Sequence, residues 1–88
     1  VGRIRATINS GGSQPTSHPQ YTVNLPVGYA MTCGGGYAAW AGEGSMLWQL
    51  KPTIDTRTRV QSFTAGAKDH IRPSTGTVFS YVLGLKIE

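Results

Sequence analysis

The C-terminal stretch TVFSYVLGLKI, residues 77–87, shows the clearest secondary-structure pattern in this 88-residue chain. Successive side chains of a β-strand point to opposite faces, so alternating apolar residues line one face. Five large apolar residues alternate in this way: Phe79, Tyr81, Leu83, Leu85 and Ile87. Ser80, Gly84 and Lys86 fall on the opposite face, with Val78 and Val82 among them. The pattern predicts a long central strand with its bulky face buried.

Shorter alternating runs occur through the rest of the chain. Ile4, Ala6 and Ile8 alternate with polar residues before Asn9 and predict a strand buried on one face. Further strands are expected near residues 21–25, 29–33, 37–41, 46–50 and 59–65, separated by turns rich in Gly and Pro. About seven short strands predict an all-β fold, an antiparallel two-sheet β-sandwich formed by a single domain over residues 1–88.

Two features of the predicted strands depend on small residues. The Gly34-Gly35-Gly36 triplet is interpreted either as a bulge or as a place where another backbone or a ligand comes close. Cys33 is the single cysteine, so no disulfide can form within the chain, and we expect it to be a small apolar core residue. Because the chain opens directly on a strand-like run at Val1, we expect that it is either cut from a longer polypeptide or a processed product.

The net charge of +4 raises the question of an acidic partner. A nucleic-acid interface requires clustered basic side chains, but here they are scattered, apart from Arg3 and Arg5 on one strand face. No segment approaches the roughly 18 consecutive apolar residues of a membrane span. We therefore expect a soluble body with neither a nucleic-acid nor a membrane partner.

Few residues in this chain have the chemistry that catalysis requires. Glycoside hydrolysis normally uses two facing carboxyl groups, and the chain contains only four acids, Glu43, Asp55, Asp69 and Glu88, scattered over turns, connections and the terminus. Two histidines and one cysteine without short ligand spacing are a weak signal for a metal. The prediction is a non-enzyme without a metal or other cofactor.

Sugar binding has requirements that this sequence meets. A pyranose stacks its C–H face on an aromatic ring, and its hydroxyls need paired donors and acceptors. The candidates are His18, Trp40, Trp48, Phe63, Asp69 and His70. The leucines around Trp48 favour a core position, whereas the alanines and Gly-rich turn around Trp40 favour the surface. An alternative for Asp69-His70 is a pair that stabilises its own loop.

Several of these segments together resemble family 56 carbohydrate-binding modules, which accompany secreted microbial β-1,3-glucanases. The resemblance covers residues 29–87, about two thirds of the chain, and is carried by the Gly34–Gly36 triplet, Trp40, the Lys68-Asp69-His70 motif and the YVLGL run at 81–85. It implies a secreted, extracellular β-sandwich that binds β-1,3-glucan, including insoluble and triple-helical forms, and brings an attached catalytic domain to this polysaccharide.

The expected carbohydrate-binding residues are therefore His18, Trp40, Phe63, Asp69 and His70. Phe63 stands where such modules tend to have a tryptophan, which predicts a smaller stacking face without an indole donor. The alternatives are a free-standing oligomeric lectin that binds cell-surface glycans and a structural domain whose aromatic residues all lie in the core.

Overall fold

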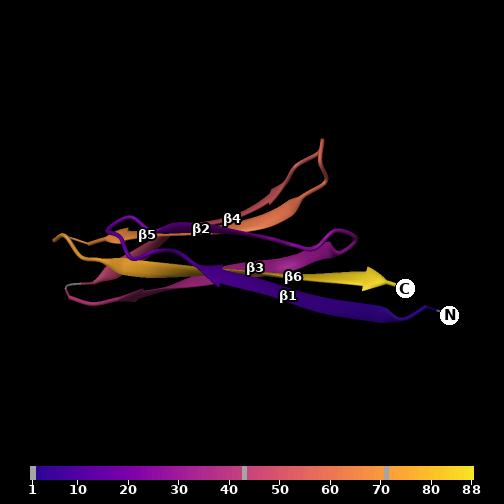
Figure 1. Ribbon diagram of the computed structural model, residues 1–88, viewed down its shortest axis with the longest axis horizontal. Helices are drawn as coiled ribbons and strands as arrows, with labels where there is room; N and C mark the ends of the chain where they lie inside the picture. Colours follow the sequence, from indigo (N-terminus) through magenta and orange to yellow (C-terminus); the bar gives the residue numbers. More distant parts are fainter. Residues whose placement is uncertain (1, 43, 71) are drawn as a thin grey trace.

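The computed structural model describes residues 2–42, 44–70 and 72–88, and within them the chain forms six β-strands and no helix (Figure 1). The strands are β1 (Ile4–Gly12), β2 (Gln20–Asn24), β3 (Ala30–Trp40), β4 (Ser45–Ile54), β5 (Gln61–Asp69) and β6 (Gly76–Ile87). The all-β prediction is confirmed, but the described strands number six and not about seven. The short strands expected on either side of the glycine triplet are one continuous strand, β3. Val1, Glu43 and Ile71 lie outside the described residues, and so does the prediction that Glu43 occupies a turn.

The six strands form two antiparallel three-stranded sheets, with the orders β1-β6-β3 and β2-β5-β4. Figure 1 shows these sheets as two layers of a flat, elongated body, a sandwich-like arrangement. β6 and β5 are the central strands, and each pairs with both other strands of its sheet. In the described part of the chain, no helix is long and apolar enough to cross a membrane.

The core between the sheets consists of two buried clusters, each of which combines residues of β6 with residues of the facing sheet. Val23, Leu25, Phe63 and Val82 form one buried cluster, and Ala65, Ala67 and Val78 form a second. The side chains of Val78, Ser80 and Val82 are fully buried. The Ser80 hydroxyl donates to the Phe63 carbonyl at 2.9 Å and so joins β6 to β5. Burial of this polar group is compatible with the core because it is hydrogen-bonded.

The prediction for the buried face of β6 is wrong. Val78, Ser80, Val82 and Gly84 face the core, and the five alternating bulky residues lie on the outer face. The reason is steric, because the sheets approach too closely for bulky side chains on both inner faces. A Cβ atom at Gly36 would lie 2.6 Å from the Cβ of Ala65, and one at Gly34 would overlap the Phe63 ring. The glycine triplet is therefore a place of close approach, and the bulge lies just before it, between Met31 and Cys33.

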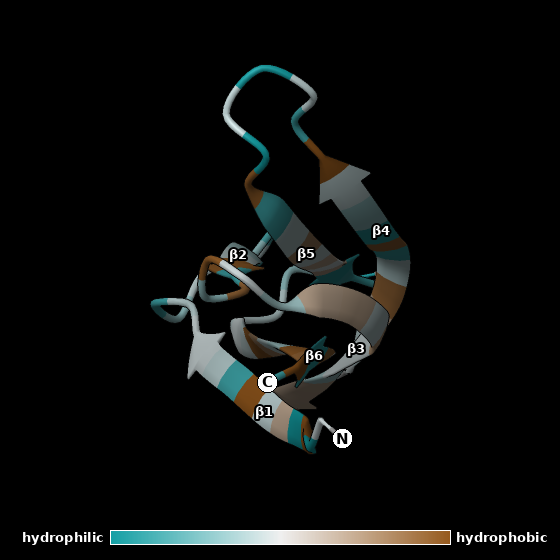
Figure 2. Ribbon diagram, turned by 90° about the vertical axis from the view of Figure 1, so that its right-hand side faces the viewer, coloured by the Kyte–Doolittle hydropathy of each residue, from teal (hydrophilic) through white to brown (hydrophobic). Residues whose placement is uncertain are grey.

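Two further predictions of burial are wrong for related reasons. Ile4 and Ile8 pair with Ile87 and Leu83 on the outer face, where they are 73% and 62% exposed. Figure 2 shows hydrophobic bands along β1, an edge strand of its sheet. The shift in register at the bulge places Cys33 opposite Leu83 on the same outer face, where the thiol is exposed.

Gln61 connects the two sheets at the beginning of β3. Its side-chain carbonyl accepts from the Met31 amide at 2.8 Å, and its amide donates to the Tyr29 carbonyl at 2.7 Å. The Gln61 side chain thus provides hydrogen bonds to one backbone donor and one backbone acceptor that would otherwise need a partner strand. This contact fixes where β3 enters its sheet.

Candidate functional site

Four of the five predicted site residues lie at one end of the sandwich, which we call the Trp40 end and define by His18, Trp40, Asp69 and His70. This is the end where β3 stops, β4 starts, β5 stops and β6 starts. Ser45 of β4 pairs with Asp69 of β5, and Trp40 of β3 pairs with Gly76 of β6. Thr16 forms an isolated antiparallel bridge with Gly76, which brings the loop before β2 to the same place. Backbone pairing thus joins segments that are far apart in the sequence.

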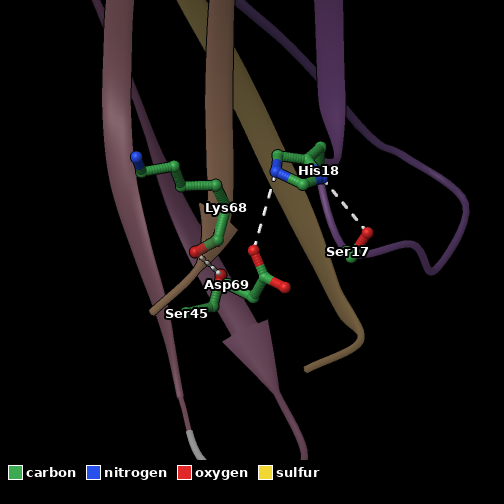
Figure 3. Close-up of polar contacts among 5 residues, drawn as sticks. All are labelled: Ser17, His18, Ser45, Lys68 and Asp69. Atoms are coloured by element: carbon green, nitrogen blue, oxygen red, sulfur yellow. Dashed lines mark hydrogen bonds and ion pairs between the residues drawn. The ribbon is translucent and has the colours of Figure 1, made fainter. Parts of the chain in front are cut away.

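The His18 ring and the Asp69 carboxylate face each other across this end (Figure 3). His18 Nε2 and Asp69 Oδ1 are 3.6 Å apart, with the imidazole largely exposed and the carboxylate about one-fifth exposed. The Asp69 amide donates to the Ser17 carbonyl at 3.0 Å, and the Ser17 hydroxyl contacts His18 Nδ1 at 3.1 Å. The backbone contact ties the end of β5 to the loop before β2, so the imidazole and carboxylate are held as a neighbouring donor and acceptor pair.

The Trp40 indole provides the apolar surface at this end. The residue is 54% exposed at the last position of β3 and lines a shallow hollow of about 330 Å³ with Pro15, Ala39 and Thr75. A Cβ atom at Gly44 would lie 4.0 Å from the indole nitrogen, so the ring reaches toward the start of β4. The predicted exposure of Trp40 agrees with this position.

His70 lies immediately after β5 and is exposed. It lines a second hollow, of about 250 Å³, with Gly44, Ser45 and Met46. The Ser45 hydroxyl donates to the Lys68 carbonyl at 3.3 Å, which ties β4 to β5 beside the hollow (Figure 3). The Trp40 end thus carries an exposed indole, two imidazoles and a carboxylate, the kinds of group that bind the apolar faces and the hydroxyls of sugars.

Phe63 does not belong to this site, and its predicted stacking role is not supported by its position. The residue is 6% exposed and lies in the core cluster with Val23, Leu25 and Val82. Its ring packs on β3 over Gly34. A ring sealed between two sheets has no face free for a ligand, so Phe63 is a core residue.

Trp48 is, after Phe63, the second aromatic residue whose predicted position is wrong. It is 58% exposed, not buried, because a bulge between Leu47 and Gln49 turns it to the outer face of the β2-β5-β4 sheet. A Cβ atom at Gly66 would lie 3.3 Å from its indole nitrogen, which places the indole over β5. The sequence offered one signal for the exposure of Trp48. Gly66 adjoins the strand predicted near residues 59–65, and a glycine in a strand often marks a place where another group comes close.

The acidic residues of the described chain are dispersed. Asp55 and Asp69 lie at opposite ends of the β4–β5 hairpin, and Glu88 pairs with Arg5 at 2.7 Å. Hydrogen bonds from the backbone amides of Thr58 and Arg57 hold the pKa of Asp55 below its ordinary value. Among the described residues, no three His, Cys, Asp or Glu side chains gather as metal ligands do.

Comparisons with protein-family models, with curated proteins and with solved structures found no match.

Proposed function

We propose that this chain is a non-catalytic carbohydrate-binding module that binds β-1,3-glucan and targets an attached glucanase to it outside the cell. The observation that supports it most directly is the convergence of His18, Trp40, Asp69 and His70 on one end of the sandwich-like fold. Trp40 offers the stacking surface, while the two imidazoles and the carboxylate offer donors and acceptors to hydroxyl groups. The resemblance of the GGG, Trp40 and Lys68-Asp69-His70 segments to family 56 modules supplies the choice of glucan.

The geometry of the Trp40 end favours a polysaccharide over a small enclosed ligand. Its two hollows are shallow and open, one lined by His70 and the other by Trp40. An open site buries little of any one sugar, so affinity must be summed over several sugars of a chain or over several modules. Such a surface suits insoluble or triple-helical glucan, which presents many equivalent sugars.

The test is depletion of the protein from solution by insoluble polysaccharides. We expect curdlan, an insoluble β-1,3-glucan, to deplete the protein, while cellulose, chitin and xylan do not. Trp40→Ala is expected to weaken retention by roughly ten-fold, the equivalent of about 1.4 kcal/mol for one lost stacking contact. Tyr37→Ala is the matched control, because Tyr37 is 56% exposed but lies on the other face of β3. Equal retention by all four polysaccharides, or none by curdlan, would contradict the proposal.

A second candidate, a free-standing oligomeric lectin, is favoured by the outer face of the β1-β6-β3 sheet. Cross-strand partners share a face, and the register gives this face Ile4, Ala6, Ile8, Ser10 and Gly12 from β1, Ala30, Cys33, Gly35, Tyr37 and Ala39 from β3, and Thr77, Phe79, Tyr81, Leu83, Leu85 and Ile87 from β6. None of these residues is charged. Soluble monomers rarely expose an apolar patch larger than a few hundred Å².

A second copy of this chain is the occupant that fits the uncharged face best. Each copy carries a net charge of +4, so two copies approach with least repulsion through a surface that carries no charge. Three long strands also offer an area of the order of the ~800 Å² that each partner contributes to a standard interface. Sedimentation over a concentration series tests this. Oligomers that Ile8→Lys with Leu85→Lys convert to monomers would support the lectin, and a monomer at every concentration would exclude it.

A further inference from the structure

The outer face of the β2-β5-β4 sheet is largely polar and carries one open indole, that of Trp48. We call it the Trp48 face. The register assigns it Gln20, Thr22 and Asn24 from β2, Ser62, Thr64, Gly66 and Lys68 from β5, and Met46, Trp48, Gln49, Lys51 and Thr53 from β4. Figure 3 shows Lys68 pointing away from the His18–Asp69 pair, as this alternation requires.

The middle strand of the Trp48 face presents small outward residues. Ser62, Thr64 and Gly66 are buried although they point outward, because longer side chains of β2 and β4 cover them. At the β4 bulge, Trp48 and Gln49 both lie against Gly66. A Cβ atom there would lie 3.3 Å from the Trp48 Nε1 and 3.0 Å from the Gln49 Oε1. The absence of a side chain at Gly66 thus lets the indole rest on the sheet while more than half of the residue stays exposed.

Hydrogen bonds hold the polar groups beside the indole in place. The Gln20 side-chain amide donates to Gln49 Oε1 at 2.9 Å, and the Thr22 and Thr64 hydroxyls are 2.7 Å apart. The side-chain carbonyl of Gln20 and the side-chain nitrogen of Gln49 take no part in the first of these bonds. An acceptor and a donor fixed next to an aromatic ring are the groups that pair with vicinal sugar hydroxyls. Groups that are already ordered lose less entropy on binding.

The Trp48 face is continuous with the Trp40 end. Met46 is the cross-strand partner of Lys68 on the Trp48 face, and it also lines the hollow that contains His70. A polysaccharide seated at the Trp40 end can therefore pass over Met46 and reach the Trp48 indole without leaving the protein surface.

We propose that the Trp48 face is a second saccharide-binding surface, which takes a further stretch of the β-linked glucan chain bound at the Trp40 end. The inference rests on the proposed function. A pyranose stacks its apolar face on the Trp48 indole, and its hydroxyls bind the side-chain carbonyl of Gln20 and the side-chain amide nitrogen of Gln49. The binding site is then longer than the Trp40 end, so affinity rises with the length of the glucan.

Two single-tryptophan variants separate this inference from the proposed function. The chain has two tryptophans, so Trp40→Phe leaves Trp48 as the only indole and Trp48→Phe leaves Trp40. Both side chains are more than half exposed, so neither substitution removes core packing. Indole fluorescence is followed while a soluble β-1,3-linked hexasaccharide, and then the disaccharide, is added to each variant.

We expect the hexasaccharide to shift the emission of both variants and the disaccharide to bind much more weakly. A response from Trp40 alone would overturn the role of the Trp48 face and leave the proposed function intact. A response from Trp48 alone would support the Trp48 face but contradict the Trp40 end. An unchanged emission in both variants, together with no retention on curdlan, would overturn both proposals.

Affinity measurements provide the second readout for the Trp48 face. Trp48→Ala is expected to weaken hexasaccharide binding roughly ten-fold, the equivalent of about 1.4 kcal/mol, and to change disaccharide binding at the Trp40 end by much less. Tyr37→Ala, an equally exposed aromatic residue on the opposite sheet, is the control and is expected to bind like the original chain. Unchanged hexasaccharide affinity in Trp48→Ala, with an unchanged circular dichroism spectrum, would contradict the inference.

Discussion

The central strands of the two sheets, β5 and β6, differ in how their residues are buried. β5 is buried at every position from Ser62 to Ala67, whereas β6 alternates strictly between buried and half-buried residues from Gly76 to Gly84. Phe63 of β5 fills the core, while Phe79 of β6 lies outside it and stacks on Tyr37 with ring centroids 4.7 Å apart. On β5 the apolar face is inside, whereas on β6, which carries apolar residues on both faces, the face with the smaller side chains is inside.

The same difference divides the two outer surfaces of the protein. Small outward residues on β5 are covered by longer side chains from β2 and β4, which gives a largely polar surface with donors and acceptors. Large outward residues on β6 give an apolar surface without charge. One surface is suited to hydroxyl-rich ligands and the other to contact with protein. The two faces are thus expected to respond differently to matched substitutions.

The largest expected effect comes from removing the two phenylalanine rings one at a time. Phe63→Ala is expected to lower the free energy of unfolding by about 3–5 kcal/mol, because it leaves a cavity between the sheets. Phe79→Ala is expected to cost about 1 kcal/mol, since its ring is half-buried and loses mainly its stacking on Tyr37. Urea unfolding measures both. Equal losses would mean that the outer face of β6 is covered and packed like the core.

Substitutions at two adjacent glycines of β3 test the same comparison and are expected to have smaller effects on stability. A Cβ atom at Gly34 would lie 2.5 Å from Cγ of Phe63, and one at Gly35 would lie 2.6 Å from Cζ of Tyr81. The Phe63 ring is held in the core, so Gly34→Ala is expected to cost about 1–3 kcal/mol by overpacking. Tyr81 lies on the outer face and can turn away, so Gly35→Ala is expected to cost less. Thermal unfolding midpoints rank the two, and a reversed order would contradict the assignment of faces.

Sequence reasoning reached the fold class but not the orientation of the strands. Alternation identifies a strand wherever it occurs, so the all-β prediction needed only local information. On β6, however, both faces carry apolar residues, Val78 and Val82 on one and Phe79 and Leu83 on the other. Which face is buried depends on what approaches it, and that is set by glycines of β3 and alanines of β5, distant in sequence.

The candidate site was predicted in part for the same reason. His18, Trp40, Asp69 and His70 could be named because their residue types, and the resemblance to a family, pointed to them. Trp48 was placed in the core on the strength of neighbouring leucines, since nothing local reveals the bulge that turns it outward. A bulge is a property of pairing between two strands, and here it shows only once β4 is aligned with β5.

The smallest expected effect lies in the turn that joins β4 to β5. The Asp55 carboxylate accepts from the Arg57 amide at 2.8 Å and from the Thr58 amide at 3.1 Å. These bonds favour the charged form and lower the pKa of Asp55 in the folded chain below the ordinary 3.8. A carboxyl group whose pKa is lowered by folding contributes stability that is present above pH 3.8 and is lost as the pH falls through its folded value.

Asp55→Asn tests this contribution, because the amide oxygen can still accept both bonds but cannot titrate in this range. The variant is expected to lose less stability than the original chain as the pH falls below 3.8, because the pKa of Asp55 is lower in the folded than in the unfolded chain. The side chain is fully solvent-exposed, so the difference will be small and will shrink further in high salt. Urea unfolding midpoints at several pH values measure it. Parallel midpoint curves for the two proteins would mean that the turn leading into β5, unlike the packed strand that follows, adds nothing to stability through charge.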